Sequence, residues 1–149
     1  MCDMYRVGFL PGDGVGPEVI AEAQKAVDAT EVAIEWLPLP WGSEYWLKHG
    51  EMMPNDAFSV VCNLDAVLMG AVGDPRIPDH VSLWGLLLAL RQRLDLWANV
   101  RPVRLLAGIP SALRADVRPQ HVDMVFVREN TEGEYSGVGG RAHHGRKAK

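Results

Sequence analysis

The sequence has few cysteines, no basic block and no long hydrophobic run, and each shortage excludes a class of protein. Two cysteines in 149 residues, Cys2 and Cys62, form no disulfide framework and have no metal-site spacing. Cys62 stands in an apolar run, which predicts a small buried side chain. A net charge of -4 without clustered cations argues against nucleic acid or an anionic membrane as the main partner. No apolar segment is long enough to span a membrane, so we expect a soluble, cytoplasmic protein.

What is present is the composition of a globular protein with a core. Hydrophobic residues make up 48% of the chain and charged residues 23%. Strand-like and helix-like segments alternate, which predicts an α/β fold with a parallel or mixed sheet and flanking helices. The strands are expected at residues 5–10, 32–37, 65–70 and 122–127, and the helices at residues 17–29 and 55–62.

Two glycine-rich segments follow predicted strands. Residues 11–18 read Pro-Gly-Asp-Gly-Val-Gly-Pro-Glu, and residues 70–75 read Gly-Ala-Val-Gly-Asp-Pro. Such loops let backbone N–H groups approach a phosphate or a flat ring. The first segment has Pro17 where the dinucleotide fingerprint needs its third glycine, so a tight turn is at least as good an interpretation as a ligand loop. For the second, both interpretations stand about equal, because ligands of open sheets gather at strand exits.

Three arginines and a tyrosine are the main chemical candidates: Arg91, Arg101, Arg128 and Tyr135. A small dicarboxylate needs planar, permanently charged groups to hold both its ends, and arginine supplies them. A phenol nearby can give or take a proton while remaining neutral at pH 7. Two of these arginines also have plainer interpretations. In one, the Arg91 side chain extends past apolar neighbours to solvent. In the other, Arg128 forms a weak surface ion pair with Glu129.

Residues 82–91 have the composition of a helix. At about 100° per residue one apolar stripe forms, which predicts a buried face. The stripe consists of Leu83, Leu87, Leu90 and Leu94. Arg91 falls on an adjoining face with Trp84 and Leu87, which are candidates for the wall of a pocket.

Several segments together resemble the β-decarboxylating dehydrogenases, the family of isopropylmalate, isocitrate and tartrate dehydrogenases. Residues 12–19, 70–75, 90–91, 98–102 and 127–136 follow that family's order and spacing. A further set is similar to the tartrate/D-malate dehydrogenase branch: residues 40–43, 50–54, 78–85 and 139–143. The resemblance runs from about residue 5 to about residue 145, and it implies an isopropylmalate-dehydrogenase-like fold.

The resemblance implies a role for each candidate. Arg91, Arg101 and Arg128 match the arginines that clasp the malate unit shared by the substrates. Tyr135 matches the tyrosine that protonates the enol left after carbon dioxide departs.

The same resemblance implies what selects the substrate. Trp84, Gly85 and Leu87 match residues that line the pocket for the substrate's side group. A bulky, neutral Trp84 followed by Gly85 fits a hydrogen or hydroxyl there, as in D-malate or tartrate, with 3-isopropylmalate as the alternative substrate.

The resemblance also implies cofactors. The loop at residues 70–75 flanks the nicotinamide of NAD in such enzymes, and the cofactor-binding residues assigned here are Val15, Ala71, Val72 and Gly73. The choice between NAD and NADP stays open. Mg²⁺ or Mn²⁺ is implied, with its ligands expected outside this chain and none within it. A homodimer is implied for the full-length enzyme.

Members of that family are well over twice as long, and their metal-binding aspartates, catalytic lysine and adenine-binding loop come after the part matched here. We therefore expect an N-terminal portion with an incomplete fold that is inactive alone. Residues 1–98 are assigned to the first, cofactor-side α/β domain and residues 99–149 to the start of the second, substrate and dimer domain, with a frayed tail from about residue 141. A non-catalytic remnant or dicarboxylate-binding fragment is the other class of function.

Overall fold

The computed structural model describes residues 4–114 and 116–140. The chain divides into two compact units, Met1–Arg93 and Leu94–Lys149, which are described separately. The tail expected to be frayed from about residue 141 lies outside the described residues. In the described part of the chain, every helix is too short or too polar to cross a membrane.

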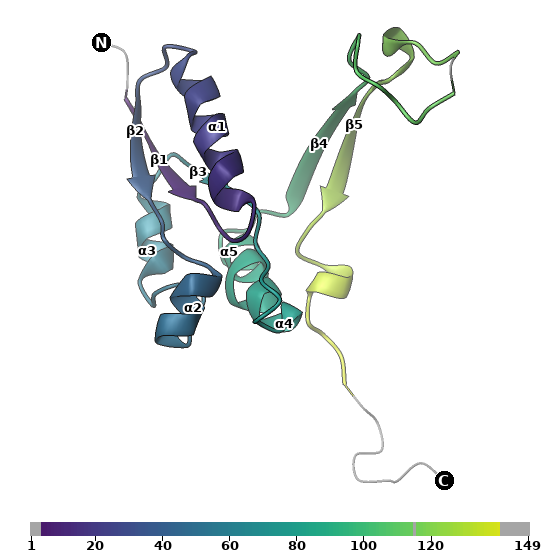
Figure 1. Cartoon of the computed structure of the whole chain (residues 1–149). Coiled ribbons are helices and arrows are strands. Elements are labelled where there is room, and N and C mark those ends of the chain that lie inside the picture. The colour runs from purple at the N-terminus through teal and green to yellow at the C-terminus, as the bar shows by residue number, and fades with distance from the viewer. Residues whose placement is uncertain (1–3, 115, 141–149) are drawn as a thin grey trace, which may run out of the picture. The chain divides into compact units, whose positions relative to one another are not determined.

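The first unit is built on a parallel sheet of three strands (Figure 1). They are β1 (Tyr5–Leu10), β2 (Ile34–Pro38) and β3 (Ala66–Met69), in the order β2-β1-β3. The prediction of an α/β fold with a parallel sheet and flanking helices is confirmed. The three strands and the first helix lie where the sequence predicted them, to within about two residues.

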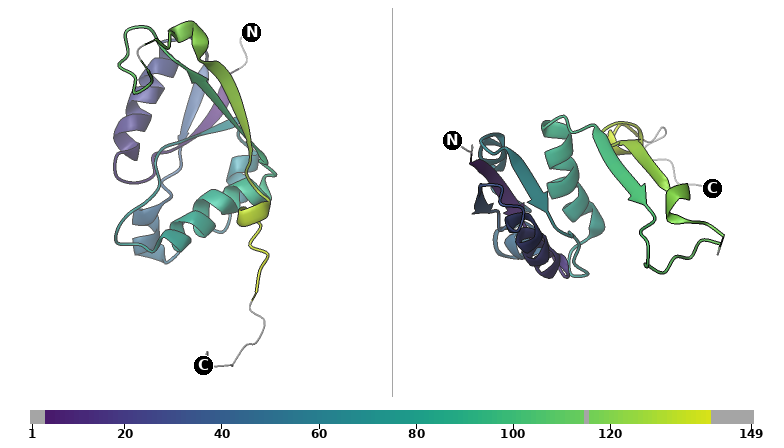
Figure 2. Two further views of the ribbon diagram at one scale, coloured as in Figure 1. Left: turned by 90° about the vertical axis from the view of Figure 1, so that its right-hand side faces the viewer. Right: turned by 90° about the horizontal axis from the view of Figure 1, so that it is seen from above.

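Helices cross between these parallel strands and cover both faces of the sheet. Helix α1 (Gly16–Asp28) joins β1 to β2, whereas α2 (Ser43–His49) and α3 (Ala57–Cys62) lie between β2 and β3. The first crossover leads from β1 to β2, and the second leads back past β1 from β2 to β3. Because the two run in opposite directions across the sheet, right-handed connections place α1 and α3 on opposite faces (Figure 2). The chain therefore reverses its winding between β1 and β3, the position at which open sheets bind ligands.

Two local expectations fail in this region. The sequence did not predict α2, because seven residues are too few to show a helical period. Gly50 ends this helix with a φ of 76°. Cys62 is exposed and not buried as expected. In the six-residue α3, Ala57 and Val61 occupy the inner face, so the next residue turns toward solvent.

A longer helical stretch follows β3 and contains a π-helical turn. It comprises α4 (Asp79–Ser82), the π turn Leu83–Leu87 and α5 (Leu88–Arg93). The predicted stripe is wrong except at Leu90: the buried leucines are Leu86, Leu88 and Leu90. In a π-helical turn, with hydrogen bonds between residues i and i+5, each residue is rotated about the helix axis by less than 100°. Every side chain after the turn therefore points in a different direction from that expected for a continuous α-helix.

The second unit is an antiparallel ribbon of β4 (Ala98–Arg104) and β5 (Asp123–Glu129). Short 3₁₀ turns lie at Pro119–His121 and Gly133–Tyr135. Apolar side chains are exposed on both faces of this ribbon. They include Val100, Val103, Met124, Val125, Phe126 and Val127.

Candidate functional site

The two glycine-rich loops meet at the carboxyl ends of neighbouring strands. β1 and β3 pair in parallel, so the loops that leave them start side by side. The Asp13 N–H donates to the Ala71 carbonyl at 2.7 Å, and the Gly70 N–H donates to the Leu10 carbonyl at 2.8 Å. Both bonds tie one loop to the other at the reversal of winding between these strands.

This arrangement brings the predicted cofactor-binding residues to one edge of the sheet. Val15 precedes α1 and is 57% exposed. Ala71 and Gly73 are exposed, and Val72 is half-buried. The four residues therefore present open surface where a ligand of an open α/β sheet would lie.

The glycines of these loops serve two different needs. A Cβ at Gly12 would lie 1.9 Å from the Ala71 carbonyl oxygen, so this glycine allows two backbones to cross closely. A Cβ at Gly14 or Gly73 would meet no atom within 4 Å. The tight-turn interpretation thus accounts for Gly12, while the space beside Gly14 and Gly73 leaves room for a ligand.

A buried carboxylate, which the sequence did not single out, connects these loops. Asp13 is only 7% exposed and accepts hydrogen bonds from Ser43 and Gly73. The only indication of Asp13 in the sequence was its position as an acidic residue among the glycines of residues 11–18. Its partners stand 30 and 60 residues away, so no local pattern could reveal them.

A second polar contact holds the same loop from the exposed side. Arg76 donates through Nη2 to Asp74 and to Glu44, both at 2.6 Å. The hydrogen bonds from Arg76 lower the pKa of Asp74 from 3.8 to about 2. The same contacts raise the pKa of Arg76. Helix α2 is thereby tied to the segment that follows β3.

Trp84 and Leu87 lie on the π turn, and Arg91 follows on α5. Trp84 is 42% exposed, and Leu87 and Arg91 are half-buried. Gly85 faces the loop between α2 and α3, because a Cβ there would lie 2.8 Å from Cγ of the buried Met52. Gly85 is thus a position of close packing in this structure.

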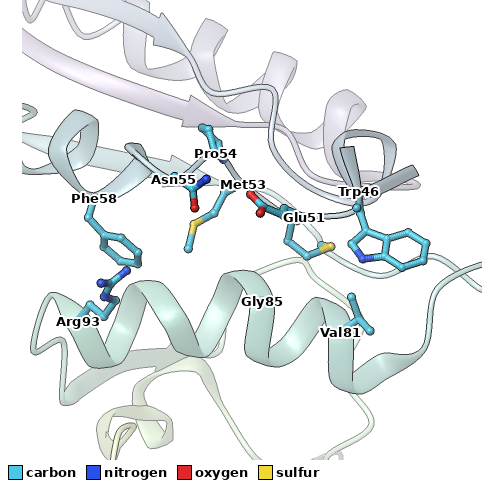
Figure 3. Close-up of a pocket in the computed structure, with 11 residues that line it drawn as sticks. Trp46, Glu51, Met53, Pro54, Asn55, Phe58, Val81, Gly85 and Arg93 are labelled. Atoms are coloured by element: carbon cyan, nitrogen blue, oxygen red, sulfur yellow. The ribbon is translucent and has the colours of Figure 1, made fainter. Parts of the chain in front are cut away.

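A pocket of about 300 Å³ opens beside Gly85 within the first unit (Figure 3). Two aromatic rings contribute to its wall, those of Trp46 and Phe58, and the Arg93 guanidinium lies 4.0 Å from the Phe58 ring centre. The pocket is lined by none of the predicted arginines, nor by Trp84 or Leu87.

In the second unit, Arg101 and Arg128 lie on one face of the ribbon. Asn99 of β4 pairs with Arg128 of β5, and directly opposed residues share a face. Arg101 is two residues after Asn99 and therefore points the same way. Its Nε donates to the Asn99 side-chain oxygen at 3.2 Å. The structure thus places two of the three predicted arginines together.

Tyr135 joins this cationic face. Arg128 donates from Nη2 to the Tyr135 phenol oxygen, and the guanidinium carbon lies 5.0 Å from the ring centre. The described structure contains no ion pair between Arg128 and Glu129, so the plainer interpretation of Arg128 is wrong.

Glu129 instead shapes the turn that returns Tyr135 to Arg128. Its carboxylate accepts from the Thr131 N–H and hydroxyl and from the Glu132 N–H, at 2.7 to 2.8 Å. These bonds, the hydroxyl of Thr131 foremost, lower the pKa of Glu129 from 4.5 to about 2. Asn130 is buried behind the turn and donates to the Leu96 carbonyl at 3.5 Å. Sequence reasoning missed both as positioning residues.

The described residues contain no group of three or more His, Cys, Asp or Glu side chains suited to a metal ion. The donors present therefore do not make a site for Mg²⁺ or Mn²⁺ by themselves.

Comparison with known proteins identifies the family. Residues 6–148 match the family described as isocitrate/isopropylmalate dehydrogenase. The chain is 47% identical to a probable tartrate dehydrogenase/decarboxylase of Bacillus subtilis, with 95% of this chain and 41% of the relative covered. It is 44% identical to the D-malate dehydrogenase (decarboxylating) of Escherichia coli, with 97% of this chain and 42% of the relative covered.

A solved structure shares the fold. The isocitrate dehydrogenase of Methylococcus capsulatus superposes with a TM-score of 0.75 at 32% identity, over 91% of this chain and 37% of that one. This chain therefore spans well under half the length of the relatives it matches.

Proposed function

Because the chain belongs to the isocitrate/isopropylmalate dehydrogenase family, we propose that it supplies the dicarboxylate-binding face and the nicotinamide-side loops of an NAD-dependent decarboxylating dehydrogenase. Its substrate is D-malate or tartrate, as the names of its relatives suggest. The observation that carries the proposal is the hydrogen bond from Arg128 to Tyr135 on the face that also holds Arg101.

Arg101 and Arg128 suit the two ends of a small dicarboxylate. Their guanidinium groups are exposed on one face of a ribbon and are permanently charged. Each can offer two parallel N–H donors to a carboxylate. Arg91 is assigned as the third cation of the clasp, on the resemblance of its segment alone.

Tyr135 suits the role of proton donor. Its oxygen accepts a hydrogen bond from Arg128, which holds the phenol on the face that carries the two arginines. The adjacent guanidinium stabilises the negative charge that remains on the oxygen when the proton leaves.

The loops after β1 and β3 suit the nicotinamide end of NAD. Open space lies beside Gly14 and Gly73, and the same two loops carry the exposed or half-buried Val15, Ala71 and Val72. When bound, NAD⁺ supplies the hydride acceptor for the oxidation. No step is assigned to a metal ion, because the described residues offer no set of ligands for one.

A chimaera tests the proposal. Residues 1–140 of this chain would replace the matching segment of the Bacillus subtilis relative, and the product would be assayed with NAD⁺ and D-malate, tartrate or 3-isopropylmalate. We expect turnover with D-malate or tartrate and little with 3-isopropylmalate. The unmodified relative is the control for folding and assay. A folded chimaera that prefers 3-isopropylmalate, or that oxidises none of the three, would overturn the proposal.

The 149-residue chain alone tests whether a working catalytic set is present within it. We expect it to bind D-malate weakly without any NAD⁺ reduction, since the proposed catalytic set is not complete within it. Measurable turnover by a homogeneous preparation would contradict this expectation.

A further inference from the structure

Asp13 occupies an unusual place, because its carboxylate is buried between three segments of the first unit. Oδ1 accepts from the Ser43 N–H at 2.9 Å. Oδ2 accepts from the Ser43 hydroxyl at 2.6 Å and from the Gly73 N–H at 2.9 Å. In the described residues no lysine or arginine pairs with it, so N–H and O–H groups alone offset its charge.

The backbone of Asp13 strengthens the same junction. Its N–H donates to the Ala71 carbonyl at 2.7 Å, and its carbonyl accepts from the Gly16 N–H at 2.8 Å. One residue thus fixes the turn after β1, the start of α2 and the loop after β3. These segments carry the residues assigned to the nicotinamide end of NAD.

We propose that Asp13 is a positioning residue for the cofactor, holding Gly73 and its neighbours in the conformation that receives the nicotinamide end of NAD. The inference rests on the proposed function for the identity of the ligand. It concerns a residue that touches neither substrate nor cofactor in the assignment above and acts only through Gly73 and Ser43.

The chemistry of the site requires a carboxylate at this position. All three groups around the Asp13 oxygens are donors, and a carboxylate accepts from every one of them. An asparagine would turn an NH₂ group toward a backbone N–H, either that of Gly73 or that of Ser43. The Ser43 hydroxyl could reverse its role, but a backbone N–H cannot. Asp13→Asn therefore removes an essential contact while changing the volume very little.

Arg76 does not replace this contact. Its bonds to Asp74 and Glu44 are on the exposed side of the loop. The pair with Glu44 is exposed on both sides and contributes little. Gly73 itself is held by the buried oxygen of Asp13.

The first arm of the test uses the 149-residue chain without ligand. Amide hydrogen exchange is measured by NMR for Gly73 and Ser43 in the wild type, in Asp13→Asn and in Asp28→Asn. Asp28 is a matched control, since its carboxylate accepts one exposed bond from Trp36 at 2.9 Å and an asparagine oxygen still accepts it. We expect exchange at Gly73 to rise about tenfold in Asp13→Asn, as for loss of one charge-assisted bond, and to be unchanged in the control.

The second arm adds NAD⁺ and follows the amide signals of residues 71–73. We expect these signals to shift in the wild type and the apparent Kd to rise about tenfold in Asp13→Asn. If NAD⁺ shifts these signals with the same apparent Kd in the wild type and in Asp13→Asn, this inference is overturned and the cofactor assignment stands. No response in the wild type overturns the cofactor assignment itself, and this inference with it.

If Asp13→Asn does not fold, Ser43→Ala gives a milder form of the test. It removes the 2.6 Å bond that orients the carboxylate and keeps the bond to Gly73. A rise of about threefold in Gly73 exchange and in the Kd for NAD⁺ supports the inference, and the absence of any change overturns it.

Discussion

Arg128 donates a hydrogen bond from Nη2 to the phenol oxygen of Tyr135, seven residues along the chain. The two side chains meet because β5 ends at Glu129, whose carboxylate folds the following turn back on itself. Cation and phenol therefore form one unit, in which the guanidinium lies on the same face of the ribbon as Arg101 and holds the phenol. The first two predictions concern this unit in the active chimaera.

Arg128→Ala should lower kcat/KM roughly 150-fold, which corresponds to a loss of about 3 kcal/mol of transition-state stabilisation. The reason is that a substrate carboxylate loses its charged partner and Tyr135 loses the hydrogen bond that orients it. Steady-state kinetics with D-malate would measure the loss. Arg104→Ala is the matched control, an exposed arginine of the same ribbon paired with Asp123 at 3.0 Å. An Arg128→Ala effect no larger than that of the control would show that Arg128 has only a surface role.

Tyr135→Phe should reduce kcat roughly 100-fold, the usual scale for a general acid, and leave KM nearly unchanged. The ring and its cation–π contact with Arg128 remain, while the phenol loses its transferable proton and the hydrogen bond that it accepts from Arg128. Tyr45→Phe on α2 controls for loss of a phenol elsewhere, since Tyr45 packs against His49. A raised KM with intact kcat would contradict the assignment of Tyr135 as proton donor.

The contact between Asp74 and Arg76 should make stability sensitive to acid. Because Arg76 lowers the pKa of Asp74 from 3.8 to about 2, the contact stabilises the folded state fully above 3.8. That stabilisation is lost as the pH falls from 3.8 through about 2. Urea midpoints measured across this range for the wild type and Arg76→Gln should differ above it and converge below it. The pKa of Glu129 is lowered in both proteins, so Glu129 does not contribute to the difference, which reports the contacts of Arg76 with Asp74 and Glu44. A constant difference at every pH would contradict the assignment.

Gly12 and Gly14, in the loop after β1, should differ sharply in how much stability is lost when each is replaced by alanine. Gly14→Ala should cost about 1–2 kcal/mol, because φ is 56° but the space around it is open. Gly12→Ala has a φ of 74° and adds a contact of 1.9 Å with the Ala71 carbonyl, so the loops must separate. We expect the Gly12 variant to lose several times more stability, roughly 4 kcal/mol, in urea denaturation. Equal losses would mean that the two loops do not cross as described.

The exposed apolar ribbon should cause the 149-residue chain to self-associate. Val125 and Val127 share one face of β5 and Phe126 occupies the other, and all three are exposed. Such patches mark interfaces or aggregation sites. Val125→Lys should shift the sedimentation profile toward monomer, whereas Val138→Lys, at a 90% exposed position beyond the ribbon, should leave it unchanged. A monodisperse wild-type monomer would refute the prediction.

The sequence by itself determined the alternation of strands and helices and the spacing of the arginines. Residues 5–10 and 17–29 carry periodic apolar patterns that depend only on near neighbours, and β1 and α1 form there. The order of its motifs was also enough to identify the family, because each motif is a local string.

Only the tertiary structure decided which residues support the site. Asp13 reaches Gly73 across 60 residues, and Gly12 faces Ala71 across 59, so neither relationship leaves a local pattern. The π turn at Leu83–Leu87 changed the buried face of its helix through a hydrogen-bond pattern that a period of 3.6 cannot represent. Local propensity reports what a segment can become, whereas contacts distant in sequence decide which of its side chains are buried, paired or free to bind.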